Sequence, residues 1–561
     1  MILKAAGSDN YPHQDGGAHM RDVFVQKVSE LSDMELDERR SSFVSLFVNG
    51  TYWGVYDLRE KVDDNHYTEE YYGQDYIYRD SDNYIQYIKT WGGTYAEFGN
   101  QPALDAWDDL INFVQDNDMA LEANYNYVDS QLNIDSLIDY FVLNSYMVNK
   151  DWLNWNTSWW RGLDPTGGAL KWRYALWDCD GVLGHSINYT GIPDTTADAD
   201  PCDAEELEVG VGHAQTIQKL VEESPIVHQR YVSRYADLLN THLSCAEVTQ
   251  VFDDLVAQIA PEMPRQIARW GGSMATWQAN VQEARDFLMT RCSQTISTGM
   301  VECYNVTGPF ETIFNVEPAD AGEIRMNSEW LQTYPFTAQM FGNLETLLTA
   351  QAATGYQFSH WVVEGATITP EDTNPDIMLQ ISQATSVTAH FTEITQGEQA
   401  LYYWHFNTLV SPPDVTVIPA DFKLLTDALP VMTYTGTGPR DIDATTGSIV
   451  NLHFDQLSGQ CARVRNPSDG RSLVFDLPTT GYKDLKFAYA VMRTNEGQLI
   501  NNLSYSVDGI NYITAGLAQT AFNITPEFSL IEVDLSSIIA ANNNDKFKIK
   551  ITFEGNTYGT S

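Results

Sequence analysis

The spacing of apolar residues changes along the chain. In roughly the first 300 residues, segments with apolar residues every three or four positions alternate with short β-rich runs, which predicts mixed helices and strands. The stretch AHMRDVFVQKVSEL (18–31) has helical spacing. DSLIDYFVLNSYMVNK (135–150) is apolar almost all round and predicts a buried helix. SSFVSLFVNGTYWGVYDLRE (41–60) predicts a hairpin, because two β-rich runs flank Asn49-Gly50.

From about residue 305 the segments become short and alternating, broken by Gly, Pro and Asn, which predicts a small all-β module. After a polar linker at 394–400, strand-like runs such as SLVFDL and FKIKITF recur, and we expect a β-sandwich of jelly-roll type. A chain of 561 residues is too long for one hydrophobic core. The predicted domains are 1–303, 304–395 and 398–561, with α+β character in the first and all-β character in the other two.

The formal charge is −44, from 76 acidic against 32 basic residues. Such a surface repels polyanions, so nucleic acid is excluded as a partner. An ATP-like anion would need a metal ion or a local basic group to offset its charge. Six cysteines without a CxxC pair argue against a zinc ribbon, and their even number permits disulfides. Cys292 and Cys303 are the most plausible local pair.

No run of about 20 apolar residues is present, so we expect no membrane-spanning segment. The first residues, MILKAAGSDNYPHQDGG, do not form a signal peptide. They read as the middle of a strand, and ITFEGNTYGTS at the other end reads as a strand that is finishing. We interpret the sequence as a fragment lacking both ends, so the missing signal says little about location.

The stretch NKDWLNWNTSWWR (149–161) combines four tryptophans with polar residues that a hydrophobic core would not need. Asp151 and Asn156 are five positions apart, the spacing at which the catalytic loop of protein kinases places an Asp at the substrate hydroxyl and an Asn at a metal ion. Both could instead cap helix ends. The tryptophans are expected to pack the loop rather than to stack on a nucleotide.

A second candidate is KWRYALWDCDGVLG (171–184), in which a strand-like run ends at Asp178 and Asp180. Two carboxylates that emerge together suit a hard cation such as Mg²⁺, which takes one or two carboxylates together with phosphate oxygens. The alternative is an ordinary turn before Gly181. The sequence has no G-x-S-x-G or H-E-x-x-H motif to support a serine hydrolase or a zinc protease.

NGTYWGVYDLRE (49–60) follows the pattern N-G-x-Y-x-G-x-Y-x-L-x-E. With Arg21-Asp22, the D-W…N…WR segment from Asp151, the W-D-x-D turn and PEMPRQIARW (261–270), it resembles the CotH-type (spore coat protein H-like) kinases and their secreted bacterial relatives over about residues 1–300. The resemblance implies an atypical protein-kinase fold. It also implies ATP and a divalent ion (Mg²⁺, Mn²⁺ or Ca²⁺), with phosphoryl transfer to a Ser or Thr of a protein.

Carried over by position, the resemblance makes Asp151 the catalytic aspartate and Asn156 a metal ligand. Asp178 and Asp180 are the other metal candidates, and Gly181 favours Asp180. Glu60 is the acid of the hairpin motif. The phosphate-binding lysine is expected on the strand before the first helix, which selects Lys4, with Lys61 and Arg59 as alternatives. The glycine-rich strands that cover a nucleotide in kinases would then precede Met1.

The β regions resemble modules of secreted bacterial surface proteins, with GYQFSHWVVEGA (355–366) as one of the matching stretches. We therefore expect an extracellular or cell-surface location, a secreted or surface protein as substrate, and carbohydrate as a ligand of the last domain. The alternative function is a catalytically inactive cell-surface adhesion protein whose β domains bind glycans or proteins.

Overall fold

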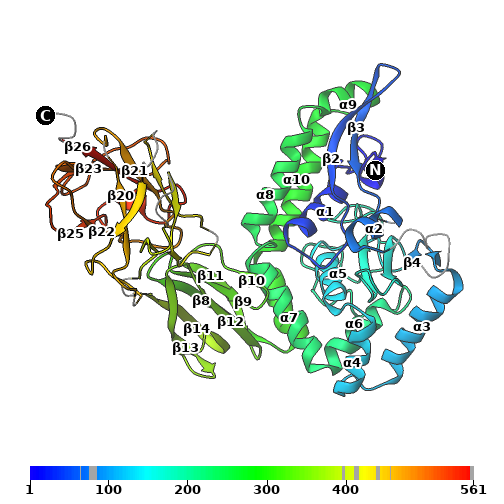
Figure 1. Cartoon of the computed structure of the whole chain (residues 1–561). Coiled ribbons are helices and arrows are strands. Elements are labelled where there is room, and N and C mark those ends of the chain that lie inside the picture. The colour runs from blue at the N-terminus through cyan, green and yellow to red at the C-terminus, as the bar shows by residue number, and fades with distance from the viewer. Residues whose placement is uncertain are drawn as a thin grey trace. The chain divides into compact units, whose positions relative to one another are not determined.

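The computed structural model describes residues 1–62, 65–74, 85–394, 399–409, 416–426, 428–436, 442–454, 456–465 and 467–555. The chain divides into two compact units, Met1–Thr392 and Glu393–Ser561 (Figure 1). The segment predicted as a small β module therefore shares a compact unit with the residues before it. The predicted linker and the chain end lie partly outside the described residues. No described helix is long and apolar enough to cross a membrane.

The first unit begins with a three-stranded antiparallel sheet in the order β1-β3-β2. Its strands are β1 (Ile2–Lys4), β2 (Ser41–Val48) and β3 (Thr51–Arg59). Asn49 and Gly50 have φ of 51° and 78°, the left-handed conformation that a two-residue hairpin turn requires. The predicted hairpin is confirmed, as is the helix before it, α1 (Arg21–Leu31).

Helix α9 (Met263–Trp270) fastens this hairpin to the rest of the unit. The side-chain oxygen of buried Gln266 accepts a hydrogen bond from the Val55 amide at 3.1 Å, and its amide group donates to the Tyr11 carbonyl at 3.0 Å. A Cβ atom on Gly54 would lie 2.7 Å from that oxygen. The glycine of the hairpin motif therefore leaves room for the glutamine.

A four-stranded sheet in the order β5-β4-β6-β7 follows, packed with helix α5 (Ile134–Tyr146). Asp135 is the one residue of α5 that is not buried, which confirms the buried helix. Trp152, Trp159 and Trp160 are fully buried and Trp155 is half-buried, so three of the four tryptophans pack as expected. The strands of this sheet are β4 (Ile85–Thr90), β5 (Thr94–Phe98), β6 (Thr157–Gly162) and β7 (Arg173–Leu176).

Helices form the remainder of this part, as the apolar spacing predicts. They are α2 (Asn65–Tyr72), α3 (Asn100–Asp116), α4 (Glu122–Gln131), α6 (His213–Glu223), α7 (Pro225–Asn240), α8 (Cys245–Ile259), α10 (Met274–Thr290) and α11 (Ile296–Tyr304). Figure 1 shows α8 and α10 lying side by side.

The predicted Cys292–Cys303 disulfide is wrong. Cys245 pairs with Cys292 and Cys202 pairs with Cys303. Cys292 follows the end of α10 and meets the first residue of the neighbouring α8, whereas Cys303 sits near the end of α11. The packing of the helices, rather than the short separation in sequence, decides the partners.

The Cys202–Cys303 bond lies beside a buried acid. Glu205 is 5% exposed and accepts hydrogen bonds from the hydroxyls of Tyr231, at 2.7 Å, and Tyr304. Burial is the main cause that raises the pKa of Glu205 to about 7, although the two tyrosine hydrogen bonds oppose the shift. We call Glu205, Tyr231 and Tyr304 the Glu205 cluster.

The first unit ends in a seven-stranded sheet in the order β10-β9-β12-β14-β8-β11, with β13 paired to β14. This confirms β structure in the region that follows residue 304. Its strands are β8 (Thr307–Glu317), β9 (Gly322–Met326), β10 (Glu329–Trp330), β11 (Phe336–Gly342), β12 (Glu345–Ala352), β13 (Tyr356–Thr369) and β14 (Asp376–Glu393).

Two side-chain amides of α7 hold this sheet. Asn240 exchanges two hydrogen bonds with the backbone of Gln339 on the edge strand β11, at 3.0 and 2.7 Å. Gln229 does the same with the backbone of Glu345 at the start of β12, at 2.6 and 3.1 Å. Each pair satisfies one donor and one acceptor of a strand, and we call them the amide clamps.

Between the clamps, Arg234 of α7 binds Asp139 of α5 at 2.8 Å and Glu329 of β10 at 2.5 Å. The buried Asp237 accepts a hydrogen bond from the Asn327 side chain at 3.0 Å. The β-sheet is thus joined to the helical part through polar groups that are buried or half-buried.

The second unit is all-β in its described part. A six-stranded sheet in the order β16-β18-β21-β26-β23-β24 is accompanied by the two-stranded sheets β15-β17, β19-β20 and β22-β25. The strands are β15 (Tyr402–Tyr403), β16 (Val417–Pro419), β17 (Phe422–Lys423), β18 (Val431–Tyr434), β19 (Ile442–Thr446), β20 (Gln460–Val464), β21 (Ser472–Asp476), β22 (Lys486–Val491), β23 (Ile500–Ser506), β24 (Ala521–Asn523), β25 (Ser529–Asp534) and β26 (Lys548–Glu554).

Candidate functional site

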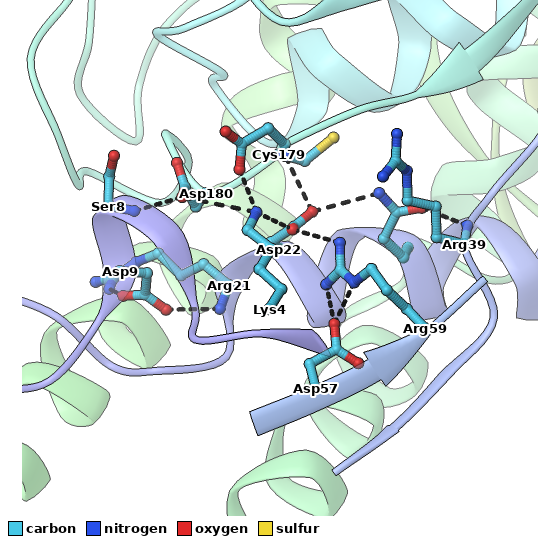
Figure 2. Close-up of polar contacts among 12 residues, drawn as sticks. Lys4, Ser8, Asp9, Arg21, Asp22, Arg39, Asp57, Arg59, Cys179 and Asp180 are labelled. Atoms are coloured by element: carbon cyan, nitrogen blue, oxygen red, sulfur yellow. Dashed lines mark hydrogen bonds and ion pairs between the residues drawn. The ribbon is translucent and has the colours of Figure 1, made fainter. Parts of the chain in front are cut away.

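Lys4, at the end of β1, lies at the centre of a buried cluster of charges (Figure 2). Its ammonium group contacts the carboxylates of Asp22, on α1, and Asp178. Asp22 also accepts hydrogen bonds from Arg59 of β3, at 2.6 Å, and from the backbone amide of Cys179, at 3.0 Å. Asp22 therefore joins the sheet, the first helix and the turn after β7.

The turn after β7 supplies two further carboxylates. Asp178 is 34% exposed at its side chain, whereas Asp180 is 1% exposed and lies 3.9 Å from the Lys4 ammonium. The backbone amide of Ser8 donates to Asp180 at 2.7 Å. Gly7 has φ of 55°, and a Cβ atom there would lie 2.3 Å from the Asp180 carboxylate. Only glycine allows the chain to pass so close to the carboxylate.

The loop after α5 lies against the same turn. The Lys150 amide donates to the Gly181 carbonyl at 2.8 Å, and a Cβ atom on Gly181 would lie 2.9 Å from the Cβ of Asp151. The Asn156 side chain donates to Oδ2 of Asp151 at 2.9 Å. Asn156 and Asp178 have φ of 38° and 57°, a backbone conformation that is uncommon outside glycine and is concentrated at functional sites.

The cluster has more carboxyl groups than basic groups. Burial, followed by the charge of Asp178, raises the pKa of Asp180 to about 8. The same two causes raise the pKa of Asp151 to about 6, against the hydrogen bond from Asn156. Burial alone would also raise the pKa of Asp22, but Arg59 and Lys4 outweigh it and hold that pKa well below its usual range.

The residues present fit a divalent cation and the phosphates of a nucleotide. Oδ1 of Asp180 is buried without a hydrogen-bond partner, and a cation would satisfy it. In the described residues no three His, Cys, Asp or Glu side chains converge into a complete metal site. An ion held by Asp178 and Asp180 would therefore need further oxygens, as Mg²⁺ takes from phosphates. Lys4, which contacts Asp178, is the candidate ligand for those phosphates.

Not every predicted residue joins this cluster. Arg59 reaches it through Asp22 and also binds Asp57. Glu60 instead accepts a hydrogen bond from the Tyr71 hydroxyl at 2.5 Å, so its described contact lies outside the cluster. Lys61 is half-buried directly after Glu60. Lys4 is the candidate for which the described residues show a contact with Asp178.

Sequence reasoning missed the role of Asp22. Its signal was present, because Arg21-Asp22 opens the first helix and is part of the pattern noted above. Asp22 and Lys4 are 18 positions apart and Asp178 is 174 from Lys4, so spacing alone could not join them.

Comparison with protein-family models finds two matches along the chain. The family model described as CotH kinase protein matches residues 1–294. The model described as divergent InlB B-repeat domain matches residues 338–395. No curated protein matches the chain. Because the first match covers more than half of the 561 residues and contains every member of the charge cluster, the chain belongs to the CotH kinase protein family.

Proposed function

We propose that the protein transfers the γ-phosphate of ATP to a Ser or Thr hydroxyl of a secreted or surface protein, with Mg²⁺, Mn²⁺ or Ca²⁺ as the divalent ion. One observation carries this proposal. Lys4 contacts both Asp22 and Asp178, beside Asp180, whose buried Oδ1 has no hydrogen-bond partner, as expected for a site that binds phosphates and a cation together.

The chain's own residues would act mainly by position and charge. Asp178 and Asp180 would hold the ion, and Lys4, fixed by Asp22, would hold the phosphates. When bound, ATP supplies the phosphoryl group and the ion offsets its charge. Asp151 accepts the proton of the acceptor hydroxyl at Oδ1, since Oδ2 already accepts from Asn156. A carboxylate whose pKa is raised to about 6 is a better proton acceptor than an ordinary aspartate.

The remaining parts of the proposal concern setting and partners. Two disulfides, Cys202–Cys303 and Cys245–Cys292, support an extracellular or surface location, because such bonds persist in oxidising compartments.

We assign the second unit a jelly-roll-like sandwich. This assignment is supported by one shared hydrophobic core, in which the ring centroids of Phe475, in the six-stranded sheet, and Phe487 of β22 are 5.3 Å apart. Carbohydrate is the ligand class that we propose for this unit.

The test is transfer of labelled phosphate from ATP to a mixture of secreted proteins, with each of the three ions. Asp151→Ala and Asp180→Ala should each reduce transfer by at least about 100-fold, the order of general-base catalysis. Asp180→Ala should also weaken binding of the ion, measured by calorimetry with ATP present.

Asp116→Ala serves as the control, since this exposed aspartate ends α3 away from the charge cluster. Equal transfer by all three variants would refute the assignment. Thermal stabilisation by ATP and metal without any transfer would instead support the inactive alternative.

A further inference from the structure

Three aromatic rings stand beside the loop that carries Asp151. We propose that these rings, Trp91, Trp155 and Tyr189, bind a proline-rich, positively charged, extended segment of the acceptor protein. We call them the aromatic row. The inference rests on the proposed phosphoryl transfer and adds to it the way in which the acceptor is held.

Hydrogen bonds hold the three rings together with the loop. The Gly92 amide, next to Trp91, donates to the Asn154 carbonyl at 3.0 Å. The Asn154 side chain donates to the Tyr189 carbonyl at 3.2 Å. A Cβ atom on Gly92 would lie 2.7 Å from the Trp155 ring, so the β4–β5 turn packs directly on that ring. The row is therefore a fixed part of the loop.

Two of the three rings face solvent, and Trp155 is half-buried. Trp91 is 65% exposed and Tyr189 is 47% exposed, in contrast to the buried tryptophans of the same loop and strand. Exposed aromatic groups of this kind mark interaction sites when they cluster. Asn154 adds a buried side-chain oxygen without a hydrogen-bond partner at the centre of the row.

The three rings form one contact group that suits a polyproline II segment. Trp155 contacts both of the others, with ring centroids 6.0 Å from Trp91 and 5.7 Å from Tyr189. Polyproline II has three residues per turn and no internal hydrogen bonds, so its proline rings lie on its surface and its backbone groups stay free to bond. Proline-rich segments dock in this form on aromatic-lined grooves.

The charge beside the row selects the sign of the partner. The chain continues from Tyr189 into an acidic segment with exposed Asp198, Asp200, Glu206 and Glu208. This segment returns to the same loop at Gly210, where a Cβ atom would lie 3.2 Å from the Leu153 backbone. Arginine or lysine in the partner would be attracted to these carboxylates and could also pack on the tryptophan rings.

The row is near enough to Asp151 to act on the same peptide. Trp155 follows Asp151 by four positions, so their Cα atoms are at most about 14 Å apart. An extended peptide covers that distance in about four residues. The phosphorylated hydroxyl is therefore expected about four residues from the docked prolines.

Three synthetic peptides test the inference without ATP, so that binding is measured apart from transfer. The first has one serine, four spacer residues and the stretch Arg-Pro-Leu-Pro-Arg. The second replaces both prolines by alanine, and the third replaces both arginines by glutamate. Fluorescence anisotropy should show the first peptide binding the full chain at least tenfold tighter than either of the others.

Trp91→Ala and Tyr189→Ala should each weaken the first peptide about tenfold, and both positions are exposed enough to tolerate the change. Phe47→Ala is the control, because Phe47 is 50% exposed at the hairpin tip and outside the row. Equal affinity for the three peptides, or unchanged affinity in both variants, would overturn the inference. Tighter binding of chitohexaose than of the first peptide, lost in Trp91→Ala, would assign the row to sugars and also overturn it.

The Asp151→Ala variant separates the two proposals, because it should bind the first peptide as the wild type does while losing phosphoryl transfer. Peptide bound normally but never phosphorylated by the wild type would leave the docking inference standing and refute the kinase function. Transfer to other proteins without any peptide binding would do the reverse.

Discussion

Replacing Glu205 by glutamine should change how the stability of the first unit depends on pH. Glu205 is buried and accepts hydrogen bonds from two tyrosine hydroxyls, and burial raises its pKa from 4.5 to about 7. Between these two values the folded protein keeps a proton that the unfolded chain has released. The free energy of unfolding therefore falls as pH rises through this window, and stays constant with respect to Glu205 above it.

The size of the effect follows from the shift. A change from 4.5 to about 7 corresponds to about 3 kcal/mol at 1.36 kcal/mol per pKa unit. Glutamine keeps an oxygen for the tyrosine hydroxyls and cannot ionise. The difference in stability between Glu205→Gln and the wild type should therefore rise by about 3 kcal/mol in favour of the variant between pH 4.5 and pH 8. For a unit of nearly 400 residues this is a Tm difference of about 4 °C.

Thermal unfolding of both proteins at half-unit pH steps measures this difference directly. Glu283→Gln on α10 is the matched control, because Glu283 is exposed and its replacement should give a flat difference across the same range. The reasoning about burial is refuted if Glu205→Gln gives the same flat line. Tyr231→Phe should extend the fall to higher pH and enlarge it, since it removes one hydrogen bond that favours the ionised form of Glu205.

Three further changes probe other contacts. Gly7→Ala should reduce phosphoryl transfer and Mn²⁺ affinity at least tenfold, because the added Cβ displaces the Asp180 carboxylate. Gly50→Ala, with open space around it, should retain both, and equal values for the two variants would remove Gly7 from the site. Gln266→Ala leaves two buried backbone groups unpaired and should lower the free energy of unfolding by about 2 kcal/mol, which lowers the Tm by about 2 °C. An unchanged Tm would mean that other contacts hold the hairpin. Replacing Cys245 and Cys292 by serine opens a loop of 47 residues and should cost about 4 kcal/mol, and an unchanged Tm would contradict that disulfide.

Local features of this fold could be predicted because short-range chemistry decides them. The Asn49-Gly50 turn needs two left-handed residues, and the buried helix at 135–150 needs apolar residues on every face. The Asp151…Asn156 spacing also points to a real contact, since Asn156 does bind Asp151. Each of these signals involves residues that are close together in the sequence.

Pairings over long distances could not be predicted in the same way. The disulfide partners depend on α8 and α10 lying together, which no cysteine spacing encodes. Asp22 binds Lys4, Arg59 and the Cys179 amide, which lie on three segments that are widely separated in sequence. The roles assigned to Asp151, Asp178 and Asp180, and the three domain boundaries, stay predictions until the experiments above are done.

The amide clamps of α7 have a practical consequence for dissecting the protein. Asn240 completes the hydrogen bonding of Gln339 on the edge strand β11 much as a further strand would, which leaves less of that edge free to pair with other molecules. Gln229 does the same for Glu345 at the start of β12. A gene fragment ended at residue 303 would leave these amides, and the carboxylate of Asp237, without their partners. Expression trials should therefore end the first fragment at residue 392, where soluble, monomeric protein is expected, and use the shorter fragment as the aggregating comparison.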